Sequence, residues 1–258
     1  APGEISGLHR RASEWFEQHG LIHEAVQHAM LEKDLDRIAR LVEQHGCALL
    51  MGGELVTLAA WLAAIEPHTR THPWLAVQKA WVLALSGQLE RAEETIKDGE
   101  QLLSNLELTD EVRTLRGSLA AARACCANTQ GNTHLAARYA LQAIDLLGVG
   151  GDFSCALRSV ATSLLGDATW AQGNLVEARR AYAEAVQIGR LAGNPHMTML
   201  SANSLADVCF ELGQLNQAAR LYSETLQTAE QVDGPNSSYA QSVYFGLSQV
   251  YYAWNRLD

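Results

Sequence analysis

A polar residue followed three positions later by an aromatic residue recurs through the second half of the chain. The pairs are Asp167 with Trp170, Asp207 with Phe210, and Gln249 with Tyr252, and successive pairs are separated by 40 and 42 residues. Asn203 precedes Asp207 by four positions. On a helix, residues three or four apart share a face, so each pair presents an aromatic ring beside a carboxylate or an amide. Such a surface can hold a sugar, another polar small molecule or a cationic group.

Residues of types that could catalyse a reaction lack the spacing that catalysis requires. His23 and His28 are five apart, which places them about 140° apart around a helix and not on the one face that a zinc site needs. His19 and His23 are four apart, but Gly20 interrupts them. The Gly148-Val149-Gly150-Gly151 stretch lacks the Gly-Lys-Ser/Thr of a phosphate-binding loop. We therefore predict no enzyme activity, no metal and no cofactor for this chain.

The cysteines favour a reducing compartment. There are five of them, an odd number, and none forms a C-x-x-C pair. A disulfide scaffold or a zinc site is therefore not expected, and a cytoplasmic location fits best. The adjacent Cys125 and Cys126 are predicted to be small core residues.

The elements that must position the polar and aromatic pairs are defined by a recurring glycine. Gly87, Gly131, Gly173 and Gly213 are separated by 44, 42 and 40 residues, and Asn255 lies 42 beyond the last of them. Glycine adopts the left-handed conformation freely and asparagine tolerates it, so a helix ends there and a second one begins. A period of this length predicts a solenoid of stacked helix pairs.

Small residues flank each turn at fixed offsets. An alanine follows each glycine by five positions, and a small residue precedes each anchor by seven; these are Ala92, Ala136, Ala178 and Ala218, and Ala80, Ala124, Gly166, Ala206 and Ser248. We expect them at close crossings of antiparallel helices. The pattern resembles the tetratricopeptide repeat, lengthened from 34 to about 40 residues. The predicted fold is an all-α, right-handed superhelix of antiparallel helix hairpins.

In such an array the first helix of each hairpin lines the concave surface, and residues ten, six and three before the turn point into the groove. For the last three hairpins these offsets predict a ligand-binding row: Asp167, Trp170, Asn203, Asp207, Phe210, Gln249 and Tyr252. The hairpin at Gly87 places mainly apolar residues there. In the alternative, the aromatic rings pack against neighbouring helices and the acids are solvated.

Composition excludes other classes of protein. With 258 residues and 48% hydrophobic content the chain can bury a sizeable core, and five prolines break few helices. No apolar run reaches the ~18 residues of a membrane span. The formal charge of −10 argues against direct contact with nucleic acid.

The first seventy residues are also helical, but they lie off the main period. Gly20 and Gly53 repeat the turn pattern, with shorter helices between them, and the Glu66-Pro67 and His72-Pro73 pairs interrupt the helices that follow. We expect a helical arm or linker over residues 1–70 and a superhelical domain over 71–258. Because the chain starts without methionine and stops inside a fifth hairpin, we expect that domain to be truncated at its C-terminal end.

Several segments resemble the MalT-like large ATP-binding LuxR-type transcription regulators. They are Arg10-Arg11-Ala12-Ser13-Glu14-Trp15-Phe16, Gly20-Leu21-Ile22-His23-Glu24-Ala25, His28-Ala29, Trp61-Leu62 with Pro67, Pro73-Trp74-Leu75, and Trp81. The resemblance covers nearly the whole chain. It implies the end of a helical arm followed by a tetratricopeptide-like sensor domain, with ATP bound by an NTPase domain elsewhere in the parent protein.

The resemblance also implies a function. The chain is expected to be the effector-sensing and oligomerisation region of a MalT-like activator, with a small-molecule inducer in the concave groove. Its other partners would be further copies or other domains of the parent regulator, with no direct nucleic-acid contact and no membrane. The alternative is a scaffold module that binds a protein or a peptide in the same groove.

Overall fold

A computed structural model describes residues 2–148, 152–234 and 238–255, and this part of the chain forms fourteen α-helices and no strand. The chain divides into two compact units, Ala1–Glu107 and Leu108–Asp258, and each is described by itself. The prediction of an all-α fold is confirmed. The predicted boundary at residue 70 lies inside the first unit, before α6, and stays a prediction about domain organisation.

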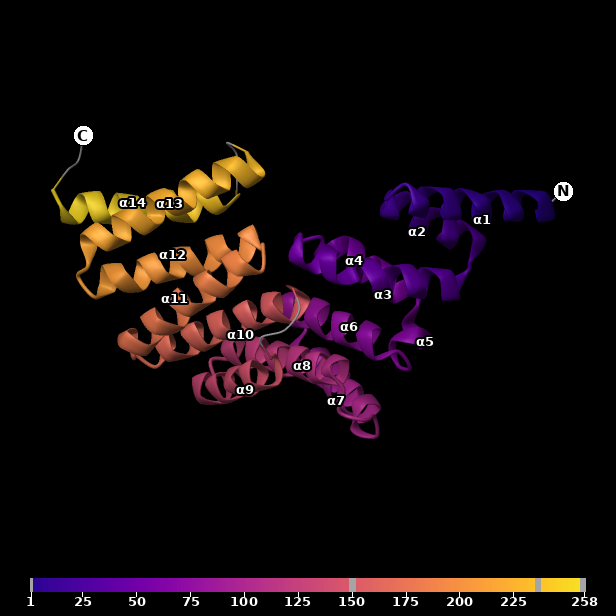
Figure 1. Cartoon of the computed structure of the whole chain (residues 1–258), viewed down its shortest axis with the longest axis horizontal. Helices are drawn as coiled ribbons and strands as arrows, with labels where there is room; N and C mark the ends of the chain where they lie inside the picture. The colour runs from indigo at the N-terminus through magenta and orange to yellow at the C-terminus, as the bar shows by residue number, and fades with distance from the viewer. Residues whose placement is uncertain (1, 149–151, 235–237, 256–258) are drawn as a thin grey trace. The chain divides into compact units, whose positions relative to one another are not determined.

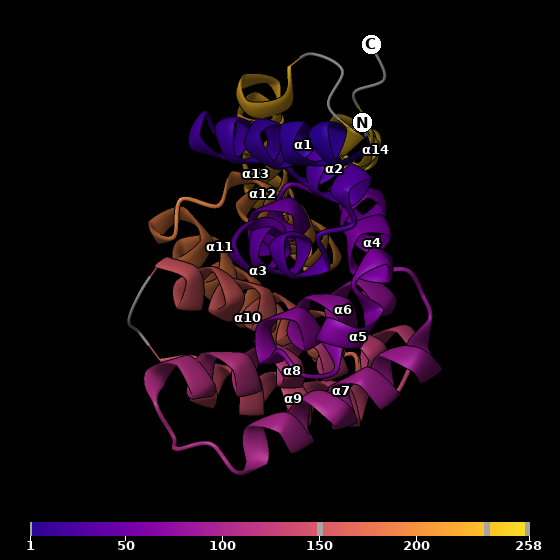
Figure 2. The same cartoon turned by 90° about the vertical axis from the view of Figure 1, so that its right-hand side faces the viewer.

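The first unit contains seven helices. They are α1 Pro2–Gln18, α2 Ile22–Glu32, α3 Leu35–Met51, α4 Leu55–Ala64, α5 Glu66–Thr69, α6 Pro73–Leu85 and α7 Leu89–Ser104. Helices α1 and α2 lie side by side in both views (Figures 1 and 2). Gly20 and Gly53 have φ of +73° and +78° at the predicted turns. The turn at Gly20 separates His19 from His23, as expected.

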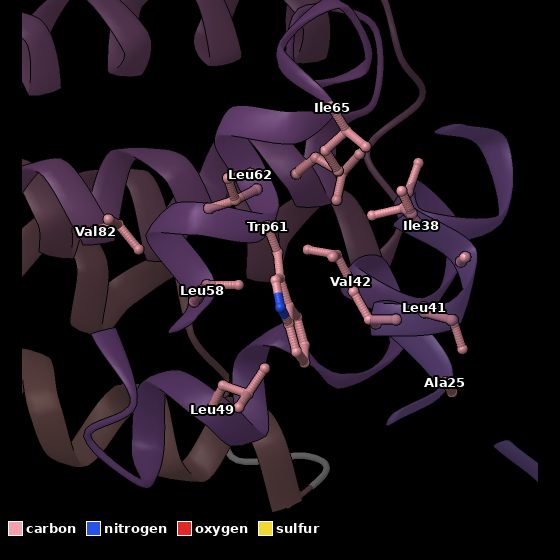
Figure 3. Close-up of a cluster of buried hydrophobic side chains, with 14 residues drawn as sticks. Ala25, Ile38, Leu41, Val42, Leu49, Leu58, Trp61, Leu62, Ile65 and Val82 are labelled. Carbon is pink, nitrogen blue, oxygen red and sulfur yellow. The ribbon is translucent and has the colours of Figure 1, made fainter. Parts of the chain in front are cut away.

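A hydrophobic cluster joins α2, α3, α4 and α6 of the first unit. Leu41 and Val42 of α3 and Leu58 of α4 are fully buried, and Trp61 is only 7% exposed. Figure 3 shows the indole of Trp61 pointing from α4 into this cluster. Helix α3 is thus a long central element of 17 residues, not one of the shorter helices that were predicted.

The second unit contains the other seven helices. They are α8 Asp110–Thr129, α9 Thr133–Leu146, α10 Asp152–Ala171, α11 Leu175–Leu191, α12 Pro195–Glu211, α13 Leu215–Asp233 and α14 Ser238–Ala253. Three antiparallel hairpins, α8 with α9, α10 with α11 and α12 with α13, stack in sequence, and α14 packs on α12 and α13 (Figure 1).

The predicted turns form as expected. Gly87, Gly131, Gly173 and Gly213 have φ between +73° and +79°, and Asn255 has φ of +55°. At Gly173 the backbone N–H donates to Trp170 O at 2.8 Å, and the N–H of Asn174 donates to Thr169 O at 2.9 Å. The side chain of Asn174 then caps α11. One residue therefore ends a helix and the next begins another.

The small residues lie at the helix crossings. Each alanine five positions after a turn glycine has no exposed surface, and Ala80, Ala124 and Ala206 are equally buried. Gly166 faces the ring of Tyr182 so closely that an added Cβ would lie 2.7 Å from the ring. Ser248 departs from the expectation, because it is exposed. Gly246 takes the close contact instead, against the ring of Tyr222.

The proline at position 67 acts differently from the prediction. Glu66 and Pro67 open the short helix α5, where a proline in the first turn costs no hydrogen bond. The interruption lies one residue earlier, at Ile65, with φ of −115° and ψ of 29°. His72 is extended before Pro73, as predicted.

Enlarging a crossing residue tests this register. Ala178→Leu and Ala218→Leu are expected to lower the free energy of unfolding by about 1–3 kcal/mol, because overpacking displaces the opposing helix. Gln187→Leu on the exposed face of α11 is the control and is expected to be near neutral. Urea unfolding measures all three. Equal stabilities would contradict the register.

Candidate functional site

The seven residues predicted to bind a ligand lie on three neighbouring helices of the second unit. Asp167 and Trp170 are on α10; Asn203, Asp207 and Phe210 are on α12; Gln249 and Tyr252 are on α14. Helix α12 contacts both α10 and α14. The equivalent residues of α6 in the first unit, Val77, Trp81 and Ala84, are buried in the core and do not form an open groove surface there.

Each of the two aspartates is bound by a tyrosine from the second helix of its own hairpin. The hydroxyl of Tyr182 on α11 donates to Asp167 Oδ1 at 2.6 Å, and the hydroxyl of Tyr222 on α13 donates to Asp207 Oδ1 at 2.5 Å. Sequence analysis did not include these tyrosines in the site. Their spacing could have identified them, because each tyrosine lies nine residues after its turn glycine and fifteen after its aspartate.

Burial dominates the electrostatics of these pairs. It raises the pKa of Asp167 and of Asp207, although the tyrosine hydroxyls act in the opposite direction, and Glu211 raises the pKa of Asp207 further. The pKa values of Tyr182 and Tyr222 are raised by burial and by the nearby carboxylates. The aspartates are therefore neither fully solvated nor paired with a basic side chain in any contact described for them.

Further contacts extend this region along α10 and α12. The indole N–H of Trp170 donates to Glu211 Oε2 at 3.1 Å, and its ring lies edge-on to Tyr182. Asn203 donates through Nδ2 to Asp207 Oδ2 at 3.3 Å, while its buried Oδ1 has no partner. Both Trp170 and Phe210 pack on the hydrophobic cluster of this unit. Five of the seven predicted residues thus belong to one connected polar and aromatic region.

The remaining two residues are placed differently. Gln249 and Tyr252 are exposed on α14, and 75% of the surface of Tyr252 is accessible. Phe245, one turn earlier on the same face, is 66% exposed. The seven predicted residues, called the inward row from here on, are therefore half-buried on α10 and α12, where four of the five form hydrogen bonds, and exposed on α14.

Cavities in each unit are lined by other residues. One of about 330 Å³ lies between α11, α12 and α13, and one of about 500 Å³ lies between α13 and α14. A third, of about 180 Å³, lies among α5, α6 and α7 of the first unit. None of the seven predicted residues lines any of these three.

None of the five cysteines forms a disulfide, and burial raises the pKa of the Cys47 and Cys125 thiols to about 11. Within the described ranges no three metal-ligating side chains come together, nor is any helix long and apolar enough to cross a membrane. The glycine-rich stretch Gly148-Val149-Gly150-Gly151 falls largely outside those ranges.

The repeats of this chain match models of known protein families. Residues 117–258 match the family model of the MalT-like TPR region, and residues 73–97 match the tetratricopeptide repeat. The chain is 29% identical over 189 residues to the HTH-type transcriptional regulator MalT of Serratia proteamaculans, covering 72% of this chain and 20% of that protein. The MalT of Cronobacter sakazakii is 27% identical over 175 residues, with 67% and 19% covered. The chain thus spans about a fifth of the length of these curated relatives.

Solved structures share the fold at low sequence identity. A signal transduction ATPase with a tetratricopeptide repeat sensor, from Pyrococcus horikoshii, superposes with a TM-score of 0.73 at 15% identity, covering 97% of this chain and 37% of that one. A Rap protein complexed with competence and sporulation factor gives 0.60 at 16% identity, covering 98% and 71%.

The pH dependence of stability tests the half-buried aspartates. Asp207→Asn keeps an oxygen that accepts from Tyr222 and removes the charge. Because the pKa of Asp207 is raised in the folded chain, its contribution to stability is present below the unfolded pKa of about 3.9 and is lost as the pH rises through the folded pKa. The variant is therefore expected to gain stability relative to the parent between pH 4 and pH 7.

Urea unfolding at several pH values measures this difference, and Asp145→Asn on the exposed face of α9 serves as the control. A difference between Asp207→Asn and the parent that does not change with pH would contradict the assignment.

Proposed function

This chain belongs to the MalT-like TPR region family, and we propose that it is the effector-sensing and oligomerisation region of a MalT-like transcription activator. The curated relatives are transcription regulators more than three times as long as this chain. In this proposal, ATP and DNA are bound by other segments of the parent protein in the cytoplasm. This chain carries out no catalysis and binds a small-molecule inducer.

The observation that carries the proposal is the inward row on α10, α12 and α14. Two consecutive hairpins place a carboxylate, held by a tyrosine, beside an aromatic ring. Asn203 adds a buried oxygen without a partner. Preorganised acceptors beside aromatic faces suit a polar small molecule with hydroxyl or N–H donors.

Hydrogen bonds between consecutive hairpins could couple inducer binding to a change in how the hairpins stack. Trp170 of α10 is bonded to Glu211 of α12, and Arg179 of α11 donates to Gln214 Oε1 at 3.2 Å. Both bonds connect one hairpin to the next. An inducer that prefers one stacking of the hairpins shifts the parent protein toward that state, here an ATP-bound, self-associated form.

A scaffold that binds a protein or peptide is the second candidate. The open surface of Phe245, Gln249 and Tyr252 on α14 favours it, because an extended partner can follow exposed aromatic residues where a small ligand lacks enclosure.

A thermal-shift screen of this chain against metabolites tests the sensor proposal. A ligand at 100 times its dissociation constant adds roughly 2.7 kcal/mol to stability. We expect at least one polar small molecule to stabilise the chain, and Tyr252→Ala and Trp170→Phe to weaken its binding by about tenfold, since each removes a contact worth about 1.4 kcal/mol.

The neighbouring tyrosine provides a matched control. Tyr251 is also exposed but faces the cavity between α13 and α14, so Tyr251→Ala is expected to bind the same ligand normally. A ligand that binds equally to all of these variants would place the sensor site elsewhere. A screen in which only peptides or proteins bind would favour the scaffold.

A further inference from the structure

The cavity of about 330 Å³ in the second unit is separate from the inward row. It lies between the end of α11, the start of α12 and one face of α13. Met199, Leu221 and Ala202 provide apolar lining, and Thr198 and Thr225 contribute hydroxyl groups. Its volume is in the range of small-molecule sites.

Three residues that line the cavity are smaller than the residues at the same positions between the two preceding hairpins. Counted from the turn glycines, Gly189 of the cavity corresponds to Leu147, Thr198 corresponds to Arg158, and Thr228 corresponds to Ile188. In that earlier junction, Arg158 Nη1 donates to the carbonyls of Ile144 and Leu147, and Nη2 lies 3.9 Å from Glu184. The space between one pair of consecutive hairpins is thus occupied by Arg158, whereas the equivalent space between the next pair is the cavity. We call the first the filled junction.

The wall of the cavity is tightly packed and offers hydrogen-bond acceptors. A Cβ on Gly189 would lie 2.7 Å from Thr198 Oγ1, so this position has no room for a larger residue. The hydroxyls of Thr198, Thr225 and Thr228 each donate to the carbonyl four residues earlier, at 2.8–2.9 Å. Their lone pairs remain available to donors from a ligand.

The rim carries both signs of charge. Arg190 Nη2 lies 3.9 Å from Glu224 Oε2, and Arg220 Nε lies 3.6 Å from the other oxygen of Glu224. Both arginines and Glu224 are largely exposed, so the two ion pairs are weak. The arginines would repel a simple cation, whereas Glu224 would repel a simple anion. A zwitterion matches both signs.

We propose that this cavity binds a free apolar α-amino acid, with its carboxylate at Arg190, its ammonium at Glu224 and its side chain over Met199 and Leu221. Bidentate contact between a guanidinium and a carboxylate favours this orientation. The hydroxyl of Thr228 accepts from the same ammonium. The site shares no lining residue with the inward row, so it holds or fails independently of the proposed sensor function.

Calorimetric titration of the chain with L-leucine tests the proposal. Leucinamide lacks the carboxylate and 4-methylpentanoate lacks the ammonium, so both are expected to bind at least about tenfold more weakly than leucine. No saturable binding of leucine up to about 10 mM, well above the millimolar range, would overturn the proposal. Equal binding of the three compounds would also overturn it.

Variants then locate the site. Thr198→Arg recreates the filled junction and is expected to abolish leucine binding, and Glu224→Gln is expected to weaken it about tenfold. Glu184→Gln alters the equivalent carboxylate of the filled junction and is expected to leave binding unchanged. Leucine binding that survives Thr198→Arg in a folded chain, verified by circular dichroism, would contradict the assignment.

Discussion

Each hairpin of the second unit depends on a chain reversal that takes place within three residues. At each turn, one residue with positive φ ends a helix and the next residue begins another, and an alanine five positions later lies in the crossing without exposed surface. The left-handed conformation strongly favours glycine, because a Cβ there is crowded by the following carbonyl. The reversal and the small residue together set how closely the two helices pack and which of their faces meet.

The inward surface follows from that geometry. Because the hairpins repeat at nearly constant spacing, a tyrosine of the second helix reaches the aspartate of the first in two consecutive repeats. Glycines at positions 166 and 246 make room for the two rings. The carboxylates are consequently held in place but partly desolvated. Desolvation of this kind disfavours the ionised form of both carboxyl groups.

Sequence analysis predicted the helices and their turns because these depend on local properties. Gly87, Gly131, Gly173 and Gly213 have the predicted conformation, and the alanines after them are buried. Contacts between helices were harder to predict. The hydroxyl partners of Asp167 and Asp207 require the relative rotation of two helices, and Ser248 was expected in a close crossing that Gly246 makes. The residues of the ligand row were placed on neighbouring helices, but their role in binding stays a prediction.

The cavity between α11, α12 and α13 could not be predicted for a related reason. It depends on three positions being small at once, and its existence becomes visible only when adjacent junctions are compared in three dimensions. The role of Pro67 was predicted wrongly for a similar reason. Proline is compatible both with the end of a helix and with the first turn of one. Tertiary packing selects between those two outcomes.

The most direct measurement of the central constraint is the stability of Gly173→Ala and Gly173→Asn, determined by urea unfolding. An added Cβ at Gly173 meets no atom within 4 Å, and φ is +79°, so the cost of each substitution comes from the backbone alone. Alanine is expected to lower the free energy of unfolding by about 1–2 kcal/mol, and asparagine by less than half as much. An alanine variant as stable as the parent would contradict the account.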